Sequence, residues 1–453
     1  MTITGQLADF LAGLEYEHLP EQVIDKAKTC ILDSIGCMLA GVPLENISKM
    51  VEEFSTADGE KIATVIGYGR KTAIQTAALL NGTMGHAVEM DDVHKEAKSH
   101  PGAVVVPAAL SVAEGAAGSG RELILAVVAG YETMLRIGSG INASAHRLQG
   151  WHATGTCGTF GAAAAASKLA RYSSAQFRSV LGLAGTQSAG LWAFTADGAN
   201  CKMFHAGKAA FSGLIAKKLV AAGITGPSQI IEAEDGGFYK ASSLDYSFAK
   251  VTAQLGERYF INEVSVKPFS CCRSMHPPIE AMLQLRDNDI TAADINEILV
   301  RTYQVAKVQC GYIQIPRNVT DAKFSIPYGV AVAFYDGSAL LDQFKEERIK
   351  DEEVLALAAK VSVEAEDKYT ASYPGRWSCN VEIVLKSGKK LAQEVVDPKG
   401  DITNPMSQQE LENKFQYLAN PVIGSEKARR VIDTINSLEN IDDIRMLTAL
   451  LQK

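Results

Sequence analysis

Acidic and imidazole side chains gather between residues 85 and 102, in a polar segment that joins two apolar stretches. The segment contains Glu89, Asp91, Asp92, His94 and His100. Carboxylates packed beside imidazoles shift one another's pKa and can hold a proton near neutral pH, which general acid–base catalysis requires. A solvated charged loop is an equally simple interpretation. A divalent-metal site is a third and weaker one, because the sequence has no helix-spaced H-E-x-x-H pair.

Three further segments place basic or imidazole side chains close to the starts of predicted helices. Glycines bracket the first, the second lies at the mouth of a long apolar helix, and the third lies where the sequence pattern changes. Cations in a cleft between two domains are what a carboxylate-rich substrate would need. The segments contain His152, then Lys202 with His205, then Lys267 with Arg273 and His276.

The first 267 residues have the periodicity of helices. Between residues 23 and 40, apolar side chains recur at helical spacing, and Gly41 and Pro43 then end the helix. Several predicted helices are rich in small residues, notably at 162–166. Small side chains let helix axes approach closely, so we expect a closely packed helical core.

The pattern changes after Lys267. Residues 298–303 and 361–365 are predicted strands, and residues 380–385 alternate and turn through 386–389 into 391–396, which predicts a hairpin. Helical periodicity returns from Ser407. We therefore expect a mainly α fold, with a large all-helical domain (1–267 plus 403–453) and a smaller α+β lid domain (268–402) inserted before the C-terminal helices.

Composition excludes several classes of function. The chain has 453 residues, 47% of them apolar, and a net charge of 44 − 52 = −8 with no Lys/Arg-rich run, so nucleic acid is not expected as a partner. Apolar stretches are broken short of the ~20 residues that span a bilayer, and the N-terminus lacks the pattern of a signal peptide. We expect a cytoplasmic protein with reduced cysteines. Neither a G-x-S-x-G elbow nor a nucleotide-binding glycine motif is present.

Together, the polar segments resemble the MmgE/PrpD family, whose members include 2-methylcitrate dehydratase, cis-aconitate decarboxylase and iminodisuccinate epimerase. The resemblance covers essentially the whole chain. Its motifs are G-H-x-x-acid-x-D-D with H-P (85–101), W-H-x-T-x-x-x-G (151–158), A-D-G with K-x-x-H-x-G-x-A (196–209), K-P-aromatic-x-x-C-x-x-x-H (267–276) and A-K-F-S-x-P-Y (322–328).

The resemblance implies a homodimer, an active site between the domains, and no cofactor or metal. It assigns the family's catalytic histidine to His100, and we add Arg273 on physical grounds as a carboxylate clamp. The sequence departs from the family pattern in two places: Glu89 replaces an Asp, and Met203-Phe204 replaces a smaller pair. The expected catalytic residues are His100, Glu89, Asp91, Asp92, His152, Lys202 and Lys267, and the expected substrate-binding residues are Arg273, His276 and His205.

These observations predict a lyase that transfers protons next to a carboxylate of a small di- or tricarboxylate. Dehydration of a 2-methylcitrate-like hydroxy acid is our first expectation, and decarboxylation of cis-aconitate or epimerisation of a dicarboxylate are the alternatives. A metal-dependent hydrolase that uses Asp91, Asp92, His94 and His100 is an alternative of another class, and a non-catalytic helical binding protein is a further one.

Overall fold

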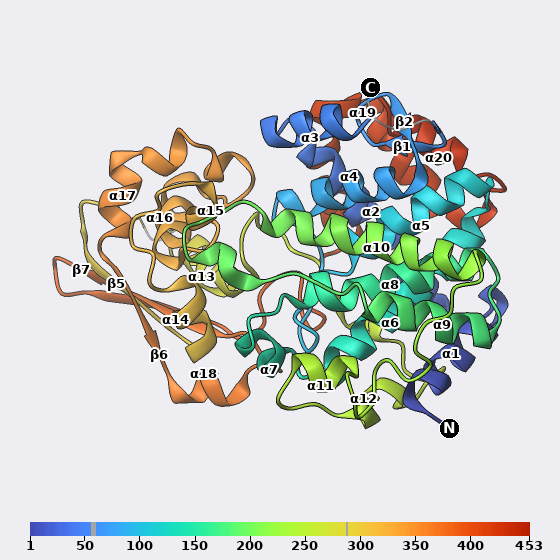
Figure 1. The fold of residues 1–453 in the computed structure, drawn as a ribbon. Coiled ribbons are helices and arrows are strands. Elements are labelled where there is room, and N and C mark those ends of the chain that lie inside the picture. Colours follow the sequence, from blue (N-terminus) through green and yellow to red (C-terminus); the bar gives the residue numbers. More distant parts are fainter. Residues whose placement is uncertain (56–59, 287–288) are drawn as a thin grey trace.

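Apolar side chains gather into two main hydrophobic cores. The computed structural model describes residues 1–55, 60–286 and 289–453. The larger core draws its buried residues from 7–264 and 415–451, and the smaller draws them from 271–395. Figure 1 shows two bodies side by side, with both termini on the larger one. The fold is mainly helical, as predicted.

Small residues let the helices of the larger core approach closely. Helix α10 packs against both α4 and α8. A Cβ added at Gly207 of α10 would lie 2.2 Å from the carbonyl oxygen of Leu79 in α4, so only glycine fits there. The helices of this body are α1 (Ile3–Gly13), α2 (Glu21–Gly41), α3 (Glu45–Ser55), α4 (Ile74–Ala87), α5 (Gly102–Ala116), α6 (Gly120–Gly140), α7 (Ala143–Leu148), α8 (Ala153–Leu169), α9 (Ser174–Gly185), α10 (Lys202–Ala221), α11 (Phe238–Ser242), α12 (Phe248–Thr252), α19 (Gln408–Asn436) and α20 (Arg445–Leu450).

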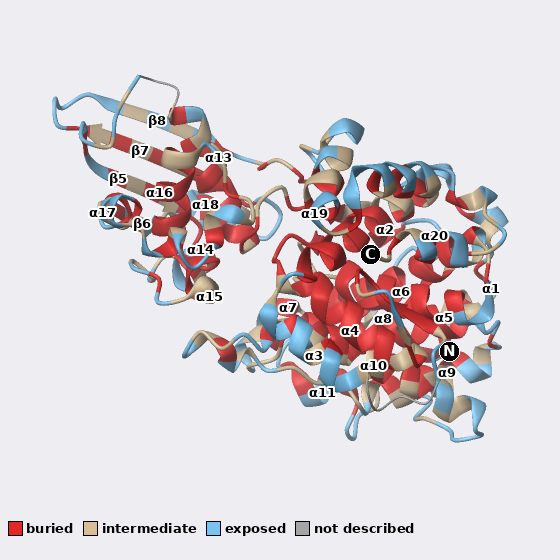
Figure 2. Ribbon diagram, turned by 90° about the horizontal axis from the view of Figure 1, so that it is seen from above, coloured by how far each residue is buried: buried red, intermediate tan, exposed pale blue. Residues whose placement is uncertain are grey.

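Helix α6 is long and apolar enough to cross a membrane, although the sequence suggested that no stretch would be. Its most apolar 18-residue window is 94% buried inside the protein. Figure 2 shows buried residues filling the centre of the larger body. The apolar character of α6 is therefore accounted for by its place in the core.

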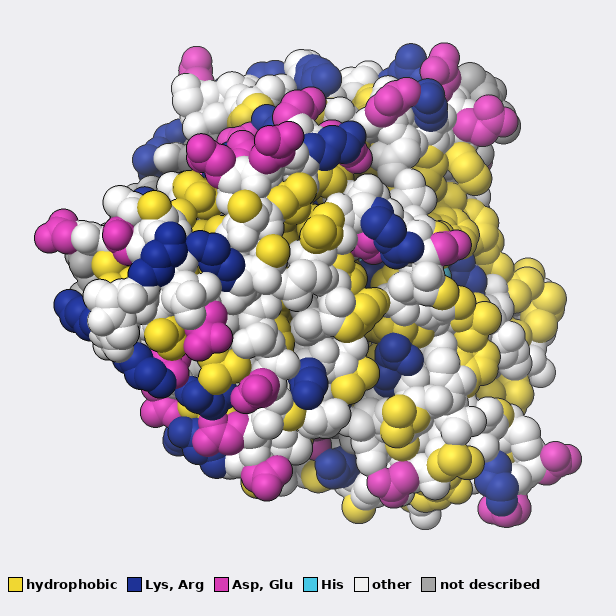
Figure 3. Space-filling view, turned by 90° about the vertical axis from the view of Figure 1, so that its left-hand side faces the viewer, with side chains coloured by type: hydrophobic (Ala, Val, Ile, Leu, Met, Phe, Trp, Pro, Cys, Tyr) yellow, Lys and Arg dark blue, Asp and Glu magenta, His cyan; other side chains and the backbone are white. Residues whose placement is uncertain are grey.

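The smaller body packs helices against one four-stranded sheet of order β6-β5-β7-β8. Strand β5 (Ile295–Thr302) runs parallel to β6 (Val361–Ala365) and antiparallel to β7 (Cys379–Leu385). The predicted hairpin is confirmed, because β7 pairs antiparallel with β8 (Lys390–Val395). On the face seen in Figure 3, cationic and acidic side chains are interspersed. The helices of this body are α13 (His276–Leu285), α14 (Gln304–Cys310), α15 (Val319–Ala322), α16 (Ile326–Asp336), α17 (Glu352–Ala358) and α18 (Asp367–Ser372).

Two short ladders complete the larger body. Strand β1 (Ala63–Val65) pairs with β2 (Arg70–Thr72). Strand β3 (Val93–His94) lies in the polar segment and pairs antiparallel with β4 (Val264–Ser265), which directly precedes the junction between the bodies. The second ladder therefore brings the polar segment beside the junction, although some 170 residues separate them in the sequence.

Candidate active site

A cavity of about 660 Å³, counting its open mouth, lies between the two bodies. The larger body contributes the acidic segment and the start of α10, and the smaller body contributes Arg273, Phe324, Tyr373 and Trp377. Five cationic side chains and one carboxylate line the cavity, so its charge suits an anion with several carboxylates. The cations are Lys98, Arg147, Lys202, Lys267 and Arg273, and the carboxylate is Glu89.

Glu89 and two lysines form the buried floor of the cavity. Helix α4 ends at Ala87, and Glu89 then turns the chain with a φ of 57°. Lys202 begins α10 and pairs with the Glu89 carboxylate. Lys267 donates to the Glu89 carbonyl oxygen at 3.1 Å and lies 3.5 Å from its carboxylate. Burial would raise the pKa of Glu89, but Lys202 and Lys267 outweigh it and hold this pKa below its usual value.

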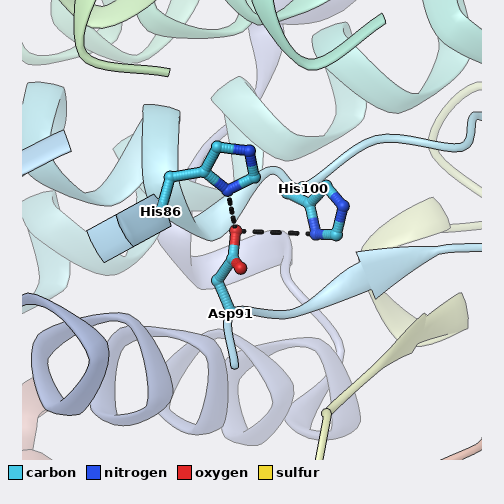
Figure 4. A group of neighbouring side chains, drawn as sticks. All are labelled: His86, Asp91 and His100. Atoms are coloured by element: carbon cyan, nitrogen blue, oxygen red, sulfur yellow. Dashed lines mark hydrogen bonds and ion pairs between the residues drawn. The ribbon is translucent and has the colours of Figure 1, made fainter. Parts of the chain in front are cut away.

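Asp91 lies between two imidazoles in the same region (Figure 4). Its Oδ2 is 2.6 Å from Nδ1 of His86 and 3.5 Å from Nδ1 of His100. Nδ1 of His100 is also 2.7 Å from the carbonyl oxygen of Asp92. A carbonyl oxygen only accepts, so the proton of neutral His100 belongs on Nδ1 and Nε2 is left as a base.

The charge state of this group follows from burial. Burial, with help from Lys267 and Lys202 and against the opposing effect of Asp91, lowers the pKa of His100 to about 3. His100 is therefore neutral in the empty cavity at pH 7. Burial also disfavours ionisation of Asp91, but His86, His100 and Lys267 outweigh it and hold the pKa of Asp91 well below its usual value.

His152 and His205 stand behind the wall of the cavity. His152 lies at the start of α8, and its Nδ1 is 3.0 Å from Nδ1 of His205. The His152 ring stacks 5.9 Å from that of His86. Burial and Lys202 hold the pKa of His152 well below its usual value, so it is neutral. The structure thus brings His152 to the imidazole cluster as a neighbour of His86.

Asp92 and His94 point away from the cluster. Asp92 accepts from Tyr131 at 2.7 Å and from the Gly102 amide at 2.8 Å. His94 accepts from the Ala97 amide at 3.1 Å. The four ligands proposed for the metal-dependent alternative therefore do not converge. Among the described residues, the group whose ligand atoms lie within 4.8 Å of one another is instead His86, Asp91 and His100.

Arg273 lines the cavity, whereas His276 supports it from behind. The Arg273 guanidinium donates to the carbonyl oxygens of Lys399 at 3.0 Å and Pro398 at 3.2 Å, and lies 3.7 Å from the Asp401 carboxylate. His276 is fully buried, with Nδ1 3.0 Å from the same guanidinium. Arg273 thus has protein partners already, and its role as a carboxylate clamp stays a prediction.

Several residues of the site escaped sequence reasoning. His86 and Lys323 lie inside recognised motifs but gave no reason to be singled out. Lys323 donates to the Val88 carbonyl oxygen at 2.9 Å, and burial lowers its pKa to about 8. Lys98 lies between the two parts of the first motif without being one of its defining residues, and Arg147 lies outside the motifs. The positions of the tryptophans would have been a useful signal for locating the cavity, because the chain has three and all of them line it.

A mainly helical body, a smaller α+β body and a cation-rich cavity between them define the class of the protein. Residues 5–250 match the MmgE/PrpD N-terminal domain and residues 269–440 match the MmgE/PrpD C-terminal domain. The chain therefore belongs to the MmgE/PrpD family and is a lyase, as its motifs predict.

Curated relatives match along nearly their whole length. A cis-aconitate decarboxylase-like protein of Aspergillus oryzae is 31% identical, over 99% of this chain and 97% of its own. A cis-aconitate decarboxylase of Aspergillus terreus is 28% identical, over 99% and 96%. The cis-aconitate decarboxylase of Homo sapiens is 27% identical, over 100% and 95%.

Proposed function

We propose that the protein decarboxylates cis-aconitate or a closely related tricarboxylate. The observation that carries this proposal is the cavity in which five cationic side chains face one carboxylate. Three substrate carboxylates would neutralise much of that excess charge. The names of the relatives support decarboxylation over the dehydration that the sequence alone made our first expectation.

The reaction needs one proton and no redox partner. The bond between the CH2 carbon of cis-aconitate and its carboxylate breaks, and its electron pair forms a new double bond to the central carbon. The electrons of the original double bond move onto its other carbon, which carries the negative charge until it takes a proton. The products are itaconate and CO2. In this proposal Lys202 and Lys267, which line the cavity, stabilise this charge through the substrate carboxylates.

His100 is the proposed proton donor. In the empty cavity it is neutral, with Nε2 unprotonated. A bound trianion raises the pKa of a neighbouring imidazole, so we expect His100 to take up a proton as the substrate binds. Asp91, 3.5 Å away, stabilises the imidazolium that results. The protonated His100 then delivers its proton to carbon.

The walls of the cavity favour loss of a charge. Trp151, Trp192 and Phe324 line it beside the lysines. An apolar surface destabilises the charged carboxylate that is lost, but it does not destabilise the neutral CO2 that forms from it. Dehydration would instead require a group that protonates a departing hydroxyl.

Proton NMR of chelator-treated enzyme with cis-aconitate in D2O tests the proposal. We expect itaconate that carries one deuterium in its saturated methylene group. Lys202→Met is expected to lower turnover at least ~10²-fold, whereas Lys240→Gln, an exposed lysine paired with Glu234, is the matched control.

Other outcomes would replace the proposal. An alkene formed only from 2-methylcitrate would make the protein a dehydratase, and deuterium exchange without net conversion would make it an epimerase. Activity that appears only on addition of a divalent cation would favour the metal-dependent alternative.

A further inference from the structure

Two cations that line the cavity have no carboxylate partner in the part of the chain that the structure describes. Lys98 donates to the hydroxyl of Ser144 at 2.6 Å and lies 4.6 Å from the centre of the Tyr373 ring. The Arg147 guanidinium lies 4.3 Å from the centre of the Trp192 ring, and its buried Nε has no hydrogen-bond partner. Both side chains line the cavity.

The other cations of the cavity are already paired. Lys202 pairs with Glu89, Lys267 lies near Glu89 and Asp91, and Arg273 bonds backbone carbonyls and lies near Asp401. Taking a cation partly out of water without an ionic partner is costly, and an anion that binds beside it lowers this cost. Lys98 and Arg147 therefore form the free positive end of the cavity.

The electrostatics agree with this placement. Burial lowers the pKa of Lys98 to about 8, and repulsion from Arg147 adds to the effect. Burial also lowers the pKa of Arg147 to about 10. The two side chains thus lie close enough to repel each other, and a carboxylate between them would relieve both penalties.

Local structure holds the pair in place. Lys98 has a φ of 46°, a conformation that L residues rarely adopt. Arg147 lies in α7, one turn after Ala143, and both line the cavity. Ser144 of the same helix holds the Lys98 ammonium, so one short helix positions both charges.

We propose that Lys98 and Arg147 form a second carboxylate subsite, which binds the substrate carboxylate farthest from the reacting carbon and selects tricarboxylates over dicarboxylates. The proposal rests on the proposed function in one respect, since it concerns the same cavity and the same class of substrate. In this proposal Lys202 and Lys267 bind the carboxylates near the reacting carbon, and Lys98 and Arg147 recognise the remaining carboxylate.

Binding of two unreactive probes tests the subsite without turnover. The probes are propane-1,2,3-tricarboxylate and glutarate, and isothermal titration calorimetry gives their Kd values for wild type, Lys98→Gln and Arg147→Gln. We expect either substitution to raise the Kd of the tricarboxylate about 10- to 100-fold. The Kd of glutarate should change less than threefold, because two carboxylates are satisfied at the floor.

Matched controls are Lys240→Gln and Arg445→Gln, whose charges are exposed and paired elsewhere. Tryptophan fluorescence gives a second readout, because all three tryptophans line the cavity. Circular dichroism shows whether each variant is folded, and Lys98, in a half-buried turn, provides the second variant if Arg147→Gln does not fold.

The outcomes separate this proposal from the proposed function. Equal weakening of both probes, or no weakening of either, would overturn the subsite even if wild type makes itaconate. Loss of the preference for the tricarboxylate in an enzyme that does not decarboxylate cis-aconitate would support the subsite and reject the proposed function.

Discussion

Replacing Asp91 by Asn should slow the enzyme by weakening the acid that delivers the proton. The substitution keeps the shape of the side chain and removes its charge. Oδ2 of Asp91 is 3.5 Å from Nδ1 of His100, and at an effective dielectric constant of ~20 this separation corresponds to about 5 kcal/mol. Loss of that attraction lowers the pKa of His100 in the substrate complex, so a smaller fraction of the complex carries the proton. We expect kcat at pH 8 to fall about 10²- to 10³-fold.

The pH dependence distinguishes this role from a structural one. The proposed acid works only while His100 is protonated, so kcat is lost as the pH rises through the pKa of His100 in the complex. A lower pKa moves this loss to lower pH. The ratio of variant to wild-type kcat should therefore rise as the pH is lowered from 8 to 6, with itaconate formation measured by NMR at saturating substrate.

Asp443→Asn serves as the control, because Asp443 pairs with Arg445 at the surface far along the chain. A ratio that stays constant with pH would refute the reasoning, since damage to the fold lowers kcat equally at every pH. An unchanged kcat would show that His100 does not depend on Asp91.

Three further perturbations test the fold and its link to the site. Arg136→Met leaves Glu132 buried without its partner at 2.9 Å, and urea titration should show a loss of about 3–5 kcal/mol of stability. Burial raises the pKa of Asp92 to about 7, so between pH 4 and 7 this acid ionises in the unfolded chain but stays protonated in the folded protein, and wild type loses stability as the pH rises. The Tm advantage of Asp92→Asn should grow over that window and then level off, and a constant difference would contradict this. Lys414 donates to the Asp33 carboxylate at 2.5 Å and to the carbonyl oxygen of the residue before Asp91 at 2.7 Å. Lys414→Met should therefore destabilise the protein by about 3 kcal/mol or more and also lower kcat. Intact activity would show that the polar segment keeps its position without Lys414.

Periodicity and motif spacing were sufficient to predict elements and family. The helical class, the hairpin of β7 and β8 and the close packing of helices rich in small residues follow from local patterns that residues within one element carry. The family follows because its motifs are spread over the whole chain. The homodimer stays a prediction from the same resemblance, and the cytoplasmic location stays a prediction from the sequence pattern.

Contacts between distant segments were beyond such reasoning. The pairing of β3 with β4 brings Lys267 close to Glu89. Each strand has only two residues, and no sequence pattern in either predicts that they pair. Similarly, nothing local shows that His94 turns away from the cluster while His86 turns into it. Lys98 and Arg147 become visible only once the burial and the missing partners of each are known.

The order in which the larger body is synthesised has a consequence for how the enzyme matures. Helix α2 packs against α19, where Phe415 and Leu418 approach Gly36, yet the whole smaller body is made between them. At roughly 5–20 residues per second, the interval is on the order of 20–70 s. During that time the apolar face of α2 that packs against α19 is exposed and available to chaperones, while the smaller body can fold first. Lys414 is also made late, so its hydrogen bond to the polar segment forms only when the ribosome has nearly finished the chain.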